Sequence, residues 1–274
     1  MRISIRHQMS LLPPAGTSNA VLQLLLTPHS GATQKIESWS VDMPGIGEAG
    51  RFTDAYGNGV HLVNQSKPEG ALVITVEGVV STTDKHGVLG RAAGEPVPAL
   101  YRRVTPLTEG SVAIFGKFQG AKETRIDVLH AVMLQVGETL GGAETATQSQ
   151  MAADGSQGQS QSQSGARVEA SAEDHAHLFI GAARQLDIPA RFVSGYLLGA
   201  EDGEPSFHAW AEAYDEALGW IGFDPKLQLC PTDRHVRLAA GLDGLTTQPV
   251  RMVPAGAVEH LLVQVEAIDR ADTA

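Results

Sequence analysis

The chain has 274 residues, a hydrophobic fraction of 42% and a formal net charge of −11. This length suits one large domain or two ordinary ones, and the acidic balance argues against a general role in binding nucleic acid or an anionic membrane. The single cysteine, Cys230, excludes an intramolecular disulfide and a cysteine-based zinc cage. No apolar run approaches the roughly 18 residues of a membrane span, and the first residues lack the apolar core of a signal peptide. We therefore expect a cytoplasmic protein.

Residues 1–82 are predicted to form a β-rich domain. Ile3 and Ile5 alternate with polar residues, and a longer alternation runs through residues 72–80, which is the period of a half-buried strand. The segment YGNG at 56–59 is a strong turn signal, since Asn and Gly tolerate positive φ. Short strands separated by turns favour a small sandwich or barrel. We predict no chemistry for its scattered histidines, His7, His29 and His61.

Residues 83–105 are predicted to be a connection, because their glycines and prolines break any period. Helical patterning begins after Pro106. Thr124 can cap a longer helix, with Asp127 at the reciprocal position. The apolar stripe of that helix consists of Ile126, Leu129, Met133, Val136 and Leu140.

Residues 141–167 differ in composition from the rest of the chain. They include the run TQSQMAADGSQGQSQSQSGA, which offers almost no apolar side chains to bury. Such a composition cannot offset the entropy lost on ordering, so we expect these residues to form a mobile, disordered Gln/Ser-rich loop. The alternative is that the glutamines of this segment are acyl donors or form a motif that binds a partner, but nothing in their spacing supports it.

A well-marked helix and three strands follow. Ser171 is a good N-cap with Asp174 three residues later, and Ile188-Pro189 ends the helix. The strands are predicted at 191–196, 208–214 and 220–224. Because the last two form a hairpin, His208 and Asp224 lie on adjacent antiparallel strands, within hydrogen-bonding reach if the register is right.

The order of these elements suits cysteine acyl transfer. A thiol at a helix N-terminus is activated by the helix dipole and by a nearby imidazole, which a carboxylate on the next strand orients. Here the imidazole is His208 and the carboxylate is Asp224, but the helix opens with Ala172 where the nucleophile would stand.

The segment 171–239 resembles the core of the transglutaminase-like superfamily in its bacterial form. The resemblance rests on AEDHAHLF from Ala172, IPARFVSGYL, HAWAEAY around His208, GWIGFDP around Asp224 and CPTDRHVRLAAG from Cys230. LTP at 26–28 and DAYGN at 54–58 resemble the β-rich domain that precedes this core. The resemblance implies an α+β fold. Residues 106–274 would form a papain/transglutaminase-like core, in which a helix packs on an antiparallel sheet, and a β-rich N-terminal domain would precede this core.

The resemblance implies a triad of Cys, His208 and Asp224, and Ala172 departs from it. Alanine cannot form a thioester, so the covalent route is removed. The preceding residues GARVEA (165–170) also depart from the small, glycine-containing approach of the family, which favours natural divergence over a single substitution.

Ser171 and Cys230 are the candidate replacements for the nucleophile, and His175, His177, His208 and Asp224 are the candidate metal ligands. Ser171 is turned by roughly 100° from the Ala172 direction and serves better as N-cap. Cys230 is interpreted as structural. His175 and His177 are two positions apart, so on a helix they point to different sides and make a poor metal pair. His208 and Asp224 have no indicated third ligand, so we predict no metal and no cofactor.

Three classes of function remain. The first is a non-catalytic transglutaminase-like protein that binds a peptide or a protein. The second is an active acyl transferase, amidase or cysteine-protease-type enzyme that acts on Gln side chains or peptide bonds through an unorthodox residue. The third is a scaffold that uses the Gln/Ser-rich loop. Ala172 favours the first class over the second, and the oligomeric state is left open.

Overall fold

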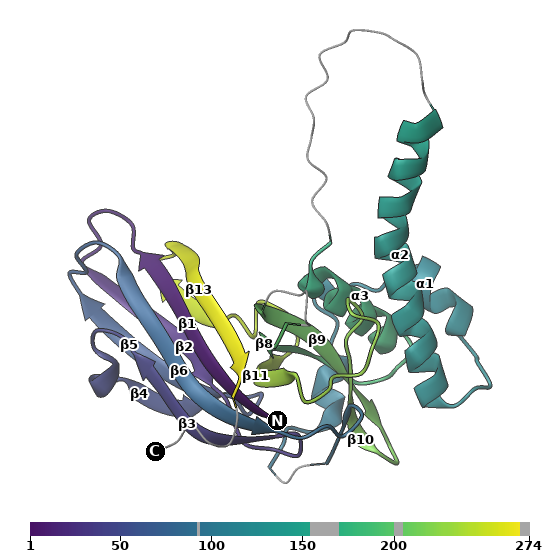
Figure 1. Cartoon of the computed structure of the whole chain (residues 1–274), viewed down its shortest axis with the longest axis horizontal. Helices are drawn as coiled ribbons and strands as arrows, with labels where there is room; N and C mark the ends of the chain where they lie inside the picture. The colour runs from purple at the N-terminus through teal and green to yellow at the C-terminus, as the bar shows by residue number, and fades with distance from the viewer. Residues whose placement is uncertain (92–93, 154–169, 200–204, 269–274) are drawn as a thin grey trace, which may run out of the picture.

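The computed structural model has a β-rich half and a mixed half that lie side by side, and helix α2 projects from the mixed half (Figure 1). The structure describes residues 1–91, 94–153, 170–199 and 205–268, and the side chains of 142–153 are not described. Among the described helices, none is both long and apolar enough to cross a membrane.

The β-rich half contains two four-stranded sheets. One has the order β13-β1-β6-β3 and the other β12-β2-β5-β4. The alternation seen in the sequence is present in β1, where Ile3 and Ile5 point into the core and their neighbours do not. The strands of this half are β1 (Arg2–Leu12), β2 (Asn19–Thr27), β3 (Gln34–Asp42), β4 (Gly50–Thr53), β5 (Gly59–Ser66), β6 (Leu72–Thr82), β12 (Val250–Val253) and β13 (Ala257–Ala267).

Two strands of this half come from the end of the chain, which corrects the predicted division at residue 106. β13 pairs antiparallel with β1, from Ile3 opposite Ala267 onward, and β12 pairs antiparallel with β2. The reason is burial: Val250 and Val265 enter the hydrophobic cluster formed by the N-terminal strands. Residues 106–274 are therefore not one structural unit, since the chain returns to the sandwich after the core sheet.

The mixed half is built on a five-stranded sheet with the order β11-β8-β9-β10-β7. Its strands are β7 (Val88–Gly90), β8 (Ala190–Leu197), β9 (Ser206–Asp215), β10 (Gly219–Phe223) and β11 (His235–Gly241). The three predicted strands correspond to β8, β9 and β10. β7 belongs to the segment predicted as a connection, and it extends the sheet by pairing with β10.

Helix α3 (Ala172–Gln185) packs against β8 and β9, and α2 (Arg125–Ala153) packs against α3. The shared core contains Phe179 of α3, Leu129 of α2 and the alanines of β9. The remaining helical turns are η1 (Ile46–Glu48), η2 (Pro98–Arg102), η3 (Pro106–Thr108), α1 (Val112–Phe115) and η4 (Gly116–Phe118).

The predicted loop at 141–167 starts too early. Helix α2 continues through residue 141 to Ala153. Residues 143–150 (AETATQSQ) contain neither proline nor glycine, so nothing in them stops a helix that has already begun. The rest of the predicted loop, residues 154–167, lies outside the described residues.

The two halves share apolar contacts. Tyr196 of β8 and Val236 and Leu238 of β11 belong to the cluster formed by the sandwich strands. A polar contact crosses the same boundary: the Nδ1 atom of His7 lies 3.1 Å from the Tyr196 hydroxyl. The other ring nitrogen of His7, Nε2, lies 2.7 Å from Nδ1 of His260 within the sandwich. The core sheet is thereby fixed against the sandwich on the side of β8 and β11.

Candidate functional site

Helix α3 begins at the position predicted for the nucleophile. Ser171 is its N-cap: the hydroxyl accepts a hydrogen bond from the backbone N of Asp174 (3.1 Å) and donates to the Asp174 carboxylate (2.7 Å). That carboxylate also accepts from the backbone N of Ser171 at 2.8 Å, which completes the predicted capping box. Ala172 is the first helical residue and is half-buried.

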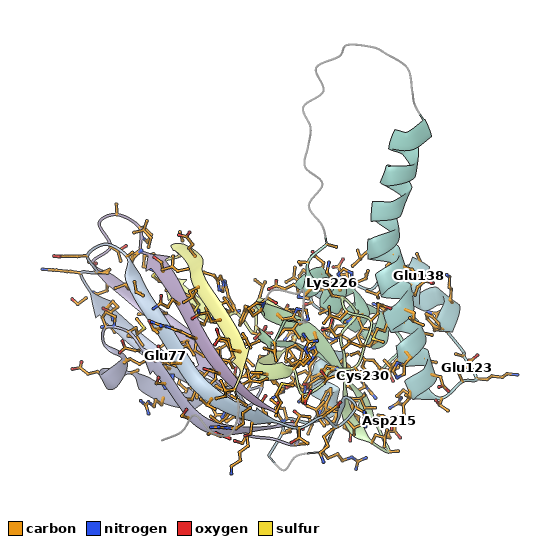
Figure 2. All side chains as sticks on the ribbon, in the orientation of Figure 1. Glu77, Glu123, Glu138, Asp215, Lys226 and Cys230 are labelled. Atoms are coloured by element: carbon orange, nitrogen blue, oxygen red, sulfur yellow. The ribbon has the colours of Figure 1, made fainter. Side chains whose placement is uncertain are left out.

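The start of α3 is tied to the turn that carries Asp224. Lys226 Nζ donates to the carbonyl oxygen of Ala170 at 3.1 Å. Figure 2 labels Lys226 on the mixed half, close to α3. Ala170 is two residues before the nucleophile position and Lys226 is two residues after Asp224. Their hydrogen bond therefore holds the nucleophile position and the carboxylate at the same end of the core.

His208 and Asp224 form the hydrogen bond that the hairpin predicts. β9 and β10 pair with Phe223 opposite Ala211, which brings the residue after β10 to the start of β9. The Nε2 atom of His208 lies 2.6 Å from Oδ2 of Asp224, and both side chains are buried.

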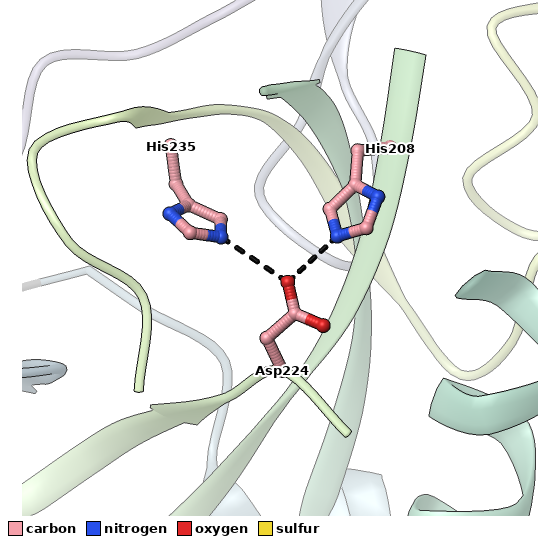
Figure 3. Close-up of side chains that lie close together, drawn as sticks. All are labelled: His208, Asp224 and His235. Carbon is pink, nitrogen blue, oxygen red and sulfur yellow. Dashed lines mark hydrogen bonds and ion pairs between the residues drawn. The ribbon is translucent and has the colours of Figure 1, made fainter. Parts of the chain in front are cut away.

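A third side chain, which the sequence did not indicate, joins them. His235, the first residue of β11, has its Nε2 atom 3.2 Å from the same Asp224 oxygen. Figure 3 shows the carboxylate between the two imidazoles, with one oxygen facing both rings. The sequence contains the motif HVRLAAG, but it does not show that this segment forms β11 and pairs with β8, which lies on the side of β9 opposite β10.

The Asp224 carboxylate is fully buried and accepts several N–H groups. Its second oxygen, Oδ1, accepts from the backbone N of Lys226 (3.1 Å) and of Leu227 (3.0 Å). Burial by itself would raise the pKa of Asp224, but the hydrogen bonds from His208, His235 and the backbone N–H of Leu227 lower it to about 2.

The protonation pattern follows from this pKa. At neutral pH Asp224 is an anion that can only accept, so His208 and His235 each donate their Nε2–H. In His208 the remaining ring nitrogen, Nδ1, makes no hydrogen bond to another described residue. The Nδ1 atom of His208 is therefore available to a ligand.

Two family models match this chain. The model described as the transglutaminase-like superfamily matches residues 122–225, which include Ala172, His208 and Asp224, and the model for the bacterial transglutaminase-like N-terminal region matches residues 3–81. The chain belongs to the transglutaminase-like superfamily.

One solved structure shares the fold of this transglutaminase-like protein. The crystal structure of a candidate cysteine protease from Cytophaga hutchinsonii aligns with a TM-score of 0.63 at 20% identity, over 100% of this chain and 92% of that one. This likeness shows a shared fold. The periplasmic domain of TgpA from Pseudomonas aeruginosa aligns with a TM-score of 0.33 at 16% identity, over 74% of this chain and 67% of that one.

A curated protein is similar to this chain over a shorter stretch. The uncharacterized protein ML0607 of Mycobacterium leprae is 31% identical over 90 residues. The match covers 31% of the transglutaminase-like chain described here and 32% of the relative. The chain therefore spans about a third of the length of that relative.

The three converging side chains of this transglutaminase-like protein suit hydrogen bonding better than a metal ion. Ligand atoms of His208, Asp224 and His235 lie within 4.8 Å of one another. However, the backbone N–H of Thr232 donates to Nδ1 of His235 at 3.2 Å. That nitrogen must carry the lone pair, so the proton of the ring is on Nε2, and a protonated Nε2 cannot bind a metal.

The other sequence candidates have partners of their own. Nδ1 of His175 lies 2.8 Å from the carbonyl of Ser171, whereas Nε2 of His177 accepts from the backbone N of Gly244 at 2.9 Å. They face different neighbours and form no ligand pair. Cys230 packs at the edge of the helix–sheet core, and burial raises the pKa of its thiol. A raised thiol pKa disfavours the reactive thiolate.

A buried ion-pair group that the sequence did not reveal lies further along the same strand. Glu212 of β9 accepts from Nε of Arg191 (2.5 Å) and from Nε of Arg237 (3.0 Å). The Arg191 guanidinium also lies over the Trp220 ring, 4.0 Å from its centroid. Burial raises the pKa of Glu212, but the two guanidinium groups outweigh it and lower the pKa. This group joins β8, β9 and β11, the strands on which the histidines depend.

Proposed function

We propose that this protein is a non-catalytic member of the transglutaminase-like superfamily that binds a peptide or protein segment at the His208 site. One observation carries the proposal: the hydrogen-bonded His208–Asp224 pair is intact, whereas the helix position that supplies the family's nucleophile is Ala172. A methyl group cannot attack a carbonyl, so acyl transfer through this position has no first step.

Neighbouring residues do not replace the nucleophile. The Ser171 hydroxyl donates to Asp174 and accepts from the backbone of α3, so it is committed to the cap. Cys230 has a raised thiol pKa and packs against the edge of the helix–sheet core. The acyl transferase, amidase or cysteine-protease alternative would need one of these side chains to leave its present contacts.

The retained geometry supports binding. Holding an ionised carboxylate in the interior requires the four N–H groups that donate to Asp224 among the described residues. The result is a fixed imidazole whose Nδ1 can accept a hydrogen bond from a ligand N–H. A Gln side chain or a backbone amide, the substrate groups that the family resemblance implies, carries such a donor.

The scaffold alternative depends on the Gln/Ser-rich segment. Residues 154–167 of that segment lie outside the described residues, so it stays a prediction. Deleting residues 154–164 while measuring peptide binding separates the two: the His208 site predicts unchanged affinity, and the scaffold predicts loss.

The proposal is tested by measuring binding and turnover on the same sample. The full chain is incubated with a fluorescently labelled Gln-containing peptide, and polarisation gives the affinity while ammonia release reports deamidation or transfer. We expect binding without ammonia. His208→Phe, which keeps a ring of similar size, should weaken binding by about tenfold, because one hydrogen bond to the ligand is lost. His86→Phe, at an exposed site, is the control. Ammonia release by the unmodified protein would contradict the proposal.

A further inference from the structure

His235 contacts the Asp224 carboxylate of the site, but the proposed function gives it no role. It shares Oδ2 of Asp224 with His208, at 3.2 Å against 2.6 Å. We propose that His235 is a positioning residue that fixes the Asp224 carboxylate and keeps His208 uncharged, with the Nδ1 atom of His208 available as an acceptor for a ligand N–H or O–H group.

The orientation of His235 is set by its own surroundings. The backbone N–H of Thr232 donates to its Nδ1, and its own backbone N–H donates to the Thr232 carbonyl, both at 3.2 Å. Its ring meets the Trp210 ring edge-to-face, with centroids 5.3 Å apart and planes at 81°. These contacts hold the ring in one orientation and one tautomer, so that Nε2–H always points at Asp224.

Because His208 and His235 share one oxygen of Asp224, the carboxylate stabilises a positive charge on His208 less strongly. A hydrogen bond donated to a carboxylate stabilises its charge and weakens its pull on a neighbouring proton. Since Oδ1 is already occupied by the amides of Lys226 and Leu227, His235 takes up the remaining capacity of Oδ2. An imidazolium at His208 is therefore less stabilised than it would be beside an unshared aspartate.

The other titratable groups at this end of the core are engaged elsewhere. Asp174 is bonded to Ser171, His175 faces the Ser171 carbonyl, and Lys226 Nζ donates to the Ala170 carbonyl. Glu173, in the same turn of α3, has a raised pKa because it is partly buried and lies beside Asp174. Asp224 and His235 are thus the titratable partners that contact His208.

The inference rests on the proposed function in one respect. Without a nucleophile to deprotonate, the neutral Nδ1 of His208 has the role of a hydrogen-bond acceptor for the bound ligand. A ligand group that only accepts, such as a carboxylate, gains nothing at this position, whereas a group that donates is held.

The first experiment needs no substitution. Nitrogen-15 NMR of the imidazoles in the full chain distinguishes a ring protonated on Nε2 from one protonated on Nδ1. Near pH 7 we expect both His208 and His235 as neutral rings protonated on Nε2. A proton on Nδ1 of His235, or a charged His235, would overturn the inference.

The second experiment uses a matched pair of variants. His235→Phe removes the donor but keeps a ring against Trp210, and it should raise the pKa of His208 by about one unit, because Asp224 is then no longer shared. His235→Gln places an amide N–H near the former Nε2 and should restore most of the original pKa. His86→Gln should leave it unchanged.

An unchanged His208 pKa in folded His235→Phe protein would contradict the positioning role, as would failure of His235→Gln to differ from His235→Phe. If His235→Phe does not fold, the tautomers of the unmodified protein and the His235→Gln titration decide the question. Ammonia release by the unmodified chain would defeat the proposed function without changing any of these readings, so the two failures are distinguishable.

Discussion

Two histidine clusters of this protein, each centred on a buried ring, differ in what that ring contacts. At the junction of the two halves, His7 faces the Tyr196 hydroxyl and a second imidazole, His260. In the core, His208 faces an ionised carboxylate. Burial and the nearby His260 lower the pKa of His7 to about 4, whereas Asp224 has its own pKa lowered to about 2. The comparison shows that this fold holds one buried imidazole between neutral groups and another against a carboxylate.

The largest expected effect comes from removing the carboxylate. Asp224→Ala leaves two imidazole N–H groups and two backbone N–H groups without their acceptor. Since an unsatisfied buried donor costs about 1–3 kcal/mol, we expect the free energy of unfolding to fall by roughly 3–5 kcal/mol in urea titrations. Asp215→Ala is the control, because Asp215 also accepts backbone N–H groups, of Ala217 and Leu218, but in an exposed turn. A loss for Asp224→Ala no larger than for Asp215→Ala would contradict the network.

The pH dependence of stability should separate the two clusters. The pKa of His7 falls from 6.5 to about 4 on folding, so between these values the unfolded chain binds the additional proton. Stability is therefore lost as the pH falls from about 6.5 to 4, by up to about 3 kcal/mol. The contribution of Asp224 is present above pH 3.8 and is lost only as the pH falls towards 2.

Urea titrations from pH 7.5 to 3.5 check this order. His7→Gln cannot titrate and should flatten the curve between pH 6.5 and 4, whereas His86→Gln, at an exposed position, should follow the unmodified protein. A flat curve for the unmodified protein over that range would show that His7 is not held neutral at the junction.

A smaller effect is expected from the neutral partner at the junction. Tyr196→Phe keeps the buried ring and removes one hydroxyl, which contacts Nδ1 of His7. The net contribution of a neutral hydrogen bond is about 1 kcal/mol, so the free energy of unfolding at pH 7.5 should fall by about that amount. A loss equal to that of Asp224→Ala would remove the distinction between the clusters.

Several features of the site could be predicted because they depend on short stretches of sequence. The cap of α3 follows from Ser171 and Asp174, and the bond between His208 and Asp224 follows from one hairpin. The apolar stripe that begins at Ile126 predicts the first part of helix α2. A cytoplasmic location stays a prediction from composition.

What could not be predicted depends on pairings between distant segments. His235 reaches Asp224 because β11 pairs with β8 and not with its neighbour in sequence, β10. β12 and β13 return to the N-terminal strands for a similar reason: their patterns indicate strands but do not name a partner. The strand predicted at 208–214 contains Glu212, but only the fold brings Arg191 and Arg237 to it.

The most direct test of the central claim is the reactivity of a thiol introduced by Ala172→Cys. The variant is treated with iodoacetamide, and intact mass with peptide mapping compares the introduced thiol with Cys230, the reference thiol present in every sample. If the site is intact and lacks only its nucleophile, the introduced thiol is alkylated first near pH 7. Adding His208→Ala should then slow that alkylation by about 100-fold, the lower end of the usual contribution of a general base. Alkylation no faster than that of Cys230, and unaffected by His208→Ala, would contradict the account.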